Sequence, residues 1–480
     1  MLAMTHAAFC RGCLLALATL SIAAEAALPE PVLRSVREAG IAPESVALWV
    51  GAANGGEPLM QHNAEQPMNP ASVMKLLTTQ AALDLLGPAY TWKTRAWLGG
   101  ELRDGRLAGD MLIAGSGDPA LSWDRLGEWL RDWRARGLRE IRGDVVVDRS
   151  LIPAPAKPAT QFDESPHRAY NARPDAFLVN FGALSLRLSA PAANGGVSAV
   201  SLIPASPLRI VNRLKASDGA CVDWRNALRG SLQTEGAGFV VTLDGKFAAS
   251  CGEKVYNLAV DDSQRWAGMV LRAQWQELGG SWSGQVRTAA LPAGLGAPFS
   301  QWESPPLPEV LRDMDKWSNN VMARLVFLGL GNDGSGVPLS VERTQARLLP
   351  WMSQQGLDPT QWIFENGSGL SRSERSTAAQ LGALLRAAWK SPRMPEFLAA
   401  QPVIGADGTM RKRLPDTPLS GRGYVKTGSL DGVKTVAGYV LDENGQWKAF
   451  ALLMNHPRAN GGEAVVDALL GWLYASRKAG

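Results

Sequence analysis

The hydrophobic pattern divides the chain into a mixed helix–strand part at each end and a strand-rich part between them. Near the N-terminus it predicts a short helix over residues 31–40 and a strand over 45–49. Apolar residues then recur with helical spacing from residue 70 to 86. A proline at the first position and Gly87-Pro88 after the last suit the start and the stop of a helix.

The middle of the chain, from about residue 90 to 280, has short β-like runs instead of helical periods. A proline-rich connector lies between residues 152 and 174. The runs cover residues 145–147, 197–203, 208–211 and 239–243. This pattern favours one or two β-rich modules.

The helical pattern returns after residue 285. Helices are predicted over 321–330, 377–389 and 462–475, and strands over 424–426, 433–441 and 447–454. The last two strands flank Asp442-Glu443-Asn444-Gly445, which suits a hairpin turn. The simplest architecture is one α/β (α+β) domain made of residues 27–88 and 280–480, with β-rich domains of residues 89–279 inserted into it.

The first 26 residues have the pattern of a secretory signal peptide. Arg11 precedes an apolar run over residues 13–24, and Ala24-Glu25-Ala26 is a small-x-small cleavage pattern. A short N-terminal anchor helix is the alternative, but the run is short for a bilayer and Pro29 and Pro31 would end a helix. We therefore expect a secreted chain without a stable membrane span.

Cleavage after residue 26 leaves two of the four cysteines, Cys221 and Cys251. In an oxidising compartment an even pair favours a disulfide. The alternative is two unpaired buried thiols.

Composition and missing motifs argue against several function classes. The net charge is only +4 and no Lys/Arg-rich run occurs, so nucleic-acid binding has little support. Three histidines remain after residue 26, without H-E-x-x-H or a His/Cys cluster, so neither a metal site nor a cofactor is predicted. The G-x-S-x-G elbow of ordinary hydrolase triads is also missing.

Ser72 and Lys75 form the strongest candidate for chemistry. Residues three apart on a helix share a face, and Lys75 is the only lysine with a serine three positions before it. A serine hydroxyl needs a base to become a nucleophile, and a lysine with a lowered pKa can serve as one. Taken alone, this S-x-x-K pattern favours a plain helix start with a solvated lysine over a catalytic pair.

Two further motifs change that balance. Ser318-Asn319-Asn320 precedes an apolar helix, and Lys426-Thr427-Gly428 ends a β-like run. The order S-x-x-K, S-x-N, K-T-G resembles the penicillin-recognising serine enzymes. The segments that point to one branch are Gly115-Ser116-Gly117-Asp118-Pro119, Asn366-Gly367-Ser368-Gly369-Leu370-Ser371-Arg372, Asp407-Gly408-Thr409-Met410 and Lys426-Thr427-Gly428-Ser429-Leu430.

That branch is the class C low-molecular-mass penicillin-binding proteins, the D-alanyl-D-alanine carboxypeptidase/endopeptidase family. Ser318 follows Lys75 by 243 positions, and this branch is known for domains inserted there. The resemblance implies a periplasmic hydrolase with a β-lactamase/D,D-transpeptidase-like domain, an antiparallel sheet with flanking helices. Its partners would be peptidoglycan peptides ending in D-Ala-D-Ala and, as covalent inhibitors, β-lactams.

The resemblance also assigns roles to residues. Ser72 would attack the carbonyl between two D-alanines, with Lys75 as its proton acceptor. Ser318 would relay a proton to the leaving amine beside Lys426, and Asn320 would hold the substrate's backbone amide.

The K-T-G segment would bind the substrate's end. The hydroxyl of Thr427 would meet the terminal carboxylate, Gly428 belongs to the same motif, and the N–H groups of Ser72 and Ser429 would form an oxyanion hole. Arg372 is a weaker candidate: it could meet an anionic group of the peptide stem or form a structural ion pair.

Two alternative functions stay open at this point. A β-lactamase is disfavoured by the long insertion and by the lack of an S-D-N form of the second motif. A non-enzymatic cell-wall-binding module would be favoured by loss of a motif residue, yet all are present. The balance between carboxypeptidase and endopeptidase activity, the third stem residue and the oligomeric state are not readable from the residues.

Overall fold

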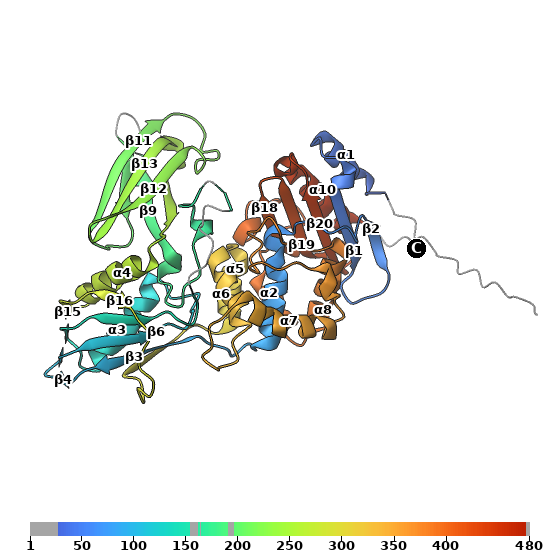
Figure 1. Ribbon diagram of the computed structural model, residues 1–480. Coiled ribbons are helices and arrows are strands. Elements are labelled where there is room, and N and C mark those ends of the chain that lie inside the picture. Colours follow the sequence, from blue (N-terminus) through green and yellow to red (C-terminus); the bar gives the residue numbers. More distant parts are fainter. Residues whose placement is uncertain (1–26, 154–161, 164, 191–195, 477–480) are drawn as a thin grey trace, which may run out of the picture.

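The computed structural model describes residues 27–153, 162–163, 165–190 and 196–476. The predicted signal peptide, residues 1–26, lies outside the described residues. Figure 1 shows two parts side by side: the segments from both ends of the chain on the right, and the segment between them on the left.

A five-stranded antiparallel sheet organises the first part, in the order β18-β19-β20-β1-β2. The strands are β1 (Val46–Ala52), β2 (Pro58–His62), β18 (Gly423–Leu430), β19 (Val433–Leu441) and β20 (Trp447–Asn455). The N-terminal and C-terminal pieces are thus hydrogen-bonded neighbours at β1 and β20.

Helices cover both faces of this sheet. The helices of this part are α1 (Glu30–Glu38), α2 (Lys75–Leu85), α5 (Leu307–Lys316), α6 (Asn320–Gly329), α7 (Val341–Gln354), α8 (Ala378–Lys390), α9 (Met394–Ala400) and α10 (Glu463–Ala475). No helix within the described residues is both long enough and apolar enough to cross a membrane.

Strand β1 shows why two helical layers are needed. Alternate side chains of a strand point to opposite faces. Val46, Leu48 and Val50 pack in one apolar cluster with α1 and α10, whereas Ala47 and Trp49 pack in another with α2 and α8. The strand is therefore buried on both sides.

The segment between α2 and α5 forms the second part, whose described residues form four sheets. A mixed sheet has the order β16-β8-β6-β3-β17, and its strands are β3 (Lys93–Gly99), β6 (Asp110–Ala114), β8 (Val145–Asp148), β16 (Val286–Thr288) and β17 (Ser300–Glu303). Beside it lies the small sheet of β4 (Leu102–Arg103), β5 (Arg106–Leu107), β7 (Glu140–Ile141) and β15 (Ser281–Trp282).

The other two sheets are drawn at the top left of Figure 1. One contains β9 (Ala183–Ser189), β10 (Ser198–Ser201) and β14 (Glu253–Ala259), the other β11 (Leu208–Ser217), β12 (Leu228–Glu235) and β13 (Gly238–Ala248). Cys221 and Cys251 form a disulfide in this region.

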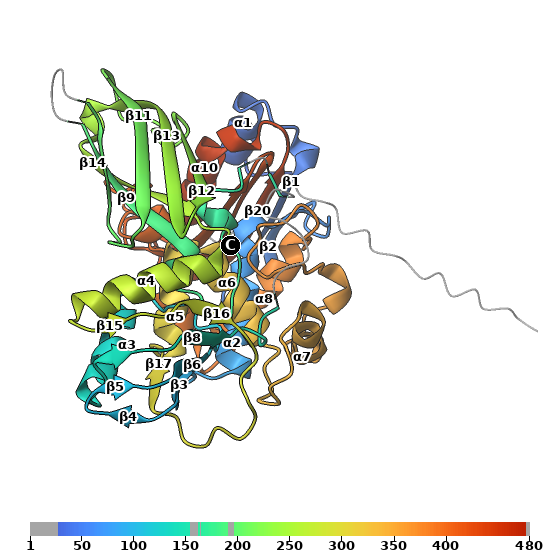
Figure 2. The same cartoon turned by 60° about the vertical axis from the view of Figure 1, so that its left-hand side comes forward.

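Two features of the second part differ from the expected β-rich insertion. It also contains two helices, α3 (Trp123–Ala135) and α4 (Ser263–Glu277), which Figure 2 shows next to the mixed sheet. In addition, β16 and β17 pair with β8 and β3, so the sheet continues past residue 279. We propose that the inserted domains extend from about residue 93 to 303.

Candidate active site

Ser72 lies just before α2 and not inside it. The predicted continuous helix over residues 70–86 is wrong at its start, because residues Ala71–Met74 form a 3-10 turn and the α-helix begins at Lys75. In a 3-10 turn, side chains three positions apart are eclipsed. Ser72 and Lys75 therefore still meet: the lysine Nζ donates to the serine Oγ over 2.9 Å.

The backbone around Ser72 is held in an unusual conformation. Ala71 has φ +44°, a region that residues with a side chain rarely adopt. The N–H of Ala71 donates to the Asn69 side chain, and the Pro70 carbonyl accepts from Thr435 of β19. These contacts fix the turn against the sheet.

Two glycines let other segments approach the Ser72 backbone. A Cβ at Gly369 would lie 1.9 Å from the Ala71 carbonyl oxygen, and a Cβ at Gly428 would lie 2.8 Å from the Ser72 nitrogen. Both positions therefore require glycine. This close approach places β18 directly beside Ser72.

Lys75 is fully buried among neutral oxygens. Besides Ser72, its Nζ donates to Asn320 Oδ1 over 2.7 Å and to the backbone carbonyl of Ser368. Ser368 belongs to the Asn366–Arg372 stretch that supported the family resemblance, so that stretch supplies a backbone group to the site.

The second and third motifs meet each other. Lys426 on β18 is fully buried, and its Nζ donates to Ser318 Oγ over 2.9 Å and to the Thr427 carbonyl over 2.9 Å. Ser318 has φ +53°, in the turn that joins α5 to α6. All three motifs are thus connected, since Asn320 bonds Lys75 and Ser318 bonds Lys426.

The remaining predicted residues line the end of β18. The Thr427 hydroxyl donates to the hydroxyl of Thr409, over 2.9 Å. Ser429 is exposed and pairs with Lys434 across the sheet. β18 is the first strand of its sheet, so no strand of the described chain pairs with its other side.

Charge and burial set the protonation of the two lysines. Burial lowers the pKa of Lys75 well below its usual value, and the nearby charge of Lys426 lowers it further, against the opposing charges of Asp315 and Glu374. Burial also lowers the pKa of Lys426, to about 8, while Asp315 opposes that shift. Burial and the charge of Lys426 thus favour the neutral form of Lys75, whereas Asp315 helps Lys426 to keep its charge.

Sequence reasoning missed the buried acid Asp315. It is fully buried on α5, where Oδ2 accepts from Thr79 over 2.6 Å and from Gln401 over 2.8 Å. Its backbone carbonyl accepts the N–H of Ser318 over 3.2 Å. Burial raises its pKa to about 6, partly offset by Lys426. Asp315 thus connects α2, the Ser318 turn and the charge on Lys426.

Sequence reasoning also missed a second buried acid, Glu374. Its Oε1 accepts the backbone N–H groups of Glu365, Asn366 and Gly367, and burial raises its pKa. It holds the loop whose Ser368 carbonyl contacts Lys75. No motif marks either acid in the sequence.

Arg372 does not take part in the contacts that connect the three motifs. Its guanidinium donates to the backbone carbonyl of Asp431 over 2.8 Å and lies 5.1 Å from the ring centre of Phe162. It forms no ion pair within the part of the chain that the structure describes. The same part contains no group of three His, Cys, Asp or Glu side chains arranged to hold a metal.

Comparison with known proteins agrees with this geometry. A model of the D-Ala-D-Ala carboxypeptidase 3 (S13) family matches residues 34–475. The chain belongs to this family. It is therefore a serine-type D-alanyl-D-alanine carboxypeptidase, a hydrolase of peptidoglycan, and the predicted resemblance is confirmed.

Relatives of the family align along most of the chain. The chain is 23% identical to a D-alanyl-D-alanine carboxypeptidase DacB of Haemophilus influenzae over 415 residues, which are 84% of this chain and 83% of the relative. It is 26% identical to a D-alanyl-D-alanine carboxypeptidase of Actinomadura sp. over 432 residues, 86% of this chain and 78% of the relative.

Solved structures identify the fold. Penicillin-binding protein 4 (dacB) of Haemophilus influenzae matches with a TM-score of 0.75 and 23% identity, over 93% of this chain and 99% of that one. A structure of that protein with a β-lactam matches with a TM-score of 0.71 at 22% identity, with the same coverage of both chains. The fold is thus that of a penicillin-binding protein, as predicted.

Proposed function

We propose that the chain cleaves D-alanyl-D-alanine peptides through an acyl-enzyme on Ser72. The observation that carries this proposal is the contact of the Ser72 hydroxyl with a buried lysine that has only neutral partners. The Ser72 oxygen attacks the carbonyl carbon between the two D-alanines, and the terminal D-alanine leaves as an amine. Water then hydrolyses the ester.

The contacts of Lys75 suit the role of base. A neutral amine has two hydrogens and one lone pair. Donation to Asn320 Oδ1 and to the Ser368 carbonyl uses both hydrogens. The lone pair is then left for the third neighbour, the Ser72 hydroxyl, whose proton it accepts as attack begins.

Lys426 and Ser318 act on the opposite side of the reaction. A charged lysine has three hydrogens, and two are used by Ser318 Oγ and the Thr427 carbonyl. The third is available for the terminal carboxylate of the peptide, together with the Thr427 hydroxyl. Ser318 passes a proton to the leaving amine, and Asn320 holds the substrate's amide.

The oxyanion that forms during attack needs hydrogen-bond donors already in place. The N–H groups of Ser72 and Ser429 supply them in this proposal. Support comes from the approach of β18 to the Ser72 nitrogen at Gly428. Each such donor contributes roughly 3 to 4 kcal/mol in comparable enzymes.

We extend the proposal to the cross-links of peptidoglycan. The bond cut by an endopeptidase is also a D-alanyl amide, so the same acyl-enzyme serves both reactions. The predicted signal peptide and the disulfide Cys221–Cys251 support secretion to an oxidising compartment, which we propose is the periplasm.

Labelling with a fluorescent penicillin tests the nucleophile. Wild-type protein is expected to form a covalent adduct, and Ser72→Ala is expected to form none. Ser353→Ala, at an exposed serine on α7, is the matched control and should label like wild type. Equal labelling of Ser72→Ala would refute the assignment.

Digestion of purified muropeptides tests the substrate. Release of D-alanine from monomers measures carboxypeptidase activity, and conversion of cross-linked dimers to monomers measures endopeptidase activity. Dimers that stay intact while D-alanine is released would reject the endopeptidase part alone.

A further inference from the structure

A cavity of about 480 Å³ lies in the second part of the molecule, away from Ser72. Strands β6, β8 and β16 run parallel, and the last residues of β8 and β16, Asp148 and Thr288, both line the cavity. Helix α4 begins there with Ser263. In sheets with parallel strands, the crevice at the carboxyl ends is the usual place for a ligand.

Arg149, directly after β8, has donors to spare at this cavity. Its side chain is 10% exposed, so nine tenths of it is buried. One terminal nitrogen, Nη1, is paired with Asp175 and lies 3.5 Å from Ser263 Oγ. The other two nitrogens, Nε and Nη2, are buried and have no hydrogen-bond partner among the described residues.

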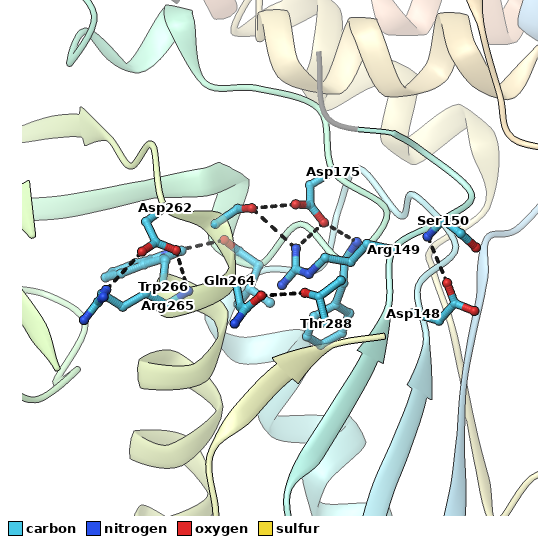
Figure 3. A network of polar contacts seen from close by, with 12 residues as sticks. Asp148, Arg149, Ser150, Asp175, Asp262, Gln264, Arg265, Trp266 and Thr288 are labelled. Carbon is cyan, nitrogen blue, oxygen red and sulfur yellow. Dashed lines mark hydrogen bonds and ion pairs between the residues drawn. The ribbon is translucent and has the colours of Figure 1, made fainter. Parts of the chain in front are cut away.

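The two unpartnered nitrogens lie on one side of the guanidinium group. That side is the fork which binds a carboxylate through two parallel hydrogen bonds. Figure 3 shows Arg149 in one network with Asp175, next to the hydrogen-bonded pair of Gln264 and Thr288. A second arginine of the lining, Arg173, also has a buried Nε without a partner in the described chain.

The acids that line the cavity do not supply what Arg149 lacks. Asp175 already accepts from Arg149, from Ser263 Oγ over 2.6 Å and from the N–H of Phe177 over 2.8 Å. Asp148 accepts the N–H groups of Ser150 and Leu291. Among the buried groups of the described lining, the unmet hydrogen-bonding capacity therefore belongs to donors, which an acceptor group of a ligand would meet.

We propose that this cavity binds the carboxylate of a small peptide or amino acid, with the Nε–Nη2 fork of Arg149 as its main contact. The N-terminus of α4 favours the same charge. Asp148, Asp175 and Asp261 line the same cavity and would repel a doubly charged phosphate more than a singly charged carboxylate. The exposed Asp261 can meet an ammonium group of the same ligand.

Calorimetric titration of the whole secreted chain tests the proposal. The probes are L-alanyl-L-alanine, the same dipeptide with its carboxylate converted to an amide, and inorganic phosphate. The dipeptide has no D,D bond, so it is not a substrate of the proposed reaction. Saturable binding of the dipeptide is expected, with weaker binding of phosphate. The amide should bind roughly tenfold weaker or worse, because it lacks the charge-assisted pair.

Variants assign the binding to the cavity. Arg149→Lys keeps the charge beside Asp175 but removes the fork, and should weaken dipeptide binding roughly tenfold. Arg173→Gln is the second variant, for the case that Arg149→Lys does not fold. Arg209→Gln, at an exposed arginine of β11 paired with Glu235, is the control and should bind like wild type.

Several results would overturn the proposal: no dipeptide binding up to the millimolar range, equal binding of the amide, phosphate binding tighter than the dipeptide, or binding unchanged in both cavity variants. Penicillin labelling of the same preparations reports on Ser72 separately. Failure at the cavity is therefore distinguishable from failure of the proposed function.

Discussion

The molecule buries one cation beside Ser72 and another at the cavity of the second part, and these two cations have different partners. In the first part, Lys75 is fully buried and donates only to neutral oxygens. In the second part, Arg149 is nine-tenths buried and holds Asp175 in a direct ion pair. Burying an unpaired charge is costly, so an amine without a counter-ion tends to give up its proton.

This difference separates two uses of buried charge. A lysine can lose its proton within the physiological range when burial is strong enough, and then becomes a base. An arginine keeps its charge and can only bind. The contrast thus points to proton transfer at Ser72 and to ligand binding at the cavity.

The largest effect is expected from removal of the base. Lys75→Ala should slow acylation by a fluorescent penicillin by roughly a thousandfold, within the usual range for a positioned base. The control is Lys434→Ala, because Lys434 also precedes a threonine but is paired with the exposed Glu463. Stopped-flow labelling gives both rates. A similar loss of acylation rate in the two variants would refute the role of Lys75 as the base.

A large loss of thermal stability is expected when the disulfide of the second part is removed. Cys221 and Cys251 are 30 positions apart, and a cross-link over such a loop stabilises by about 3 to 4 kcal/mol in the chain-entropy model. The double variant Cys221→Ser/Cys251→Ser should therefore melt at lower temperature in calorimetry. Penicillin labelling below that temperature should be unchanged, since neither cysteine contacts Ser72, Lys75 or Lys426. Loss of labelling at low temperature would show that the two parts depend on each other.

The sequence predicts those features of the fold and of the candidate site that depend on contacts between residues close together in the chain. Ser72 and Lys75 are one turn apart, so a four-residue pattern is enough to find them. Even there the conformation was mistaken, because Ala71 and its 3-10 turn are imposed by Gly369, Gly428 and Thr435, distant in sequence. The motif predicts the contact but not the backbone that makes it.

Non-local packing explains what was missed. Asp315 looks like any acid of an amphipathic helix, and only the packing of α5 against α2 buries it beside the lysines. Strands β16 and β17 pair with strands more than a hundred positions earlier, which periodicity cannot show. Helices α3 and α4 did have local signals, the N-caps Ser122 and Asp262.

A moderate effect is expected on the pH dependence of KM. The pKa of Lys426 is about 8, so its positive charge is present below that pH and is lost as pH rises through it. KM for a peptide ending in D-Ala-D-Ala should accordingly increase above pH 8. In Asp315→Asn the opposing negative charge is gone, the pKa of Lys426 falls, and the rise in KM should begin roughly one pH unit lower.

The control for this shift is Asp84→Asn, at an acid of α2 that bonds Trp351 and Arg393 instead. It should leave the pH profile in place even if it lowers stability. A profile that does not move in Asp315→Asn would show that the acid only supports packing through Thr79 and Gln401.

The smallest effect is expected at Arg372, on KM for stem peptides. Like Arg149 it is a charged guanidinium, but it is exposed and its described contacts are a backbone carbonyl and an aromatic ring. A surface cation contributes modestly to binding an anion, because water screens it. Arg372→Ala should therefore raise KM severalfold, by about 1 kcal/mol or less, for stem peptides with a free carboxylate. It should leave KM unchanged when that carboxylate is amidated, and kcat should stay the same for both. Equal losses on the two peptides would assign Arg372 to holding the loop at Asp431 rather than to binding substrate.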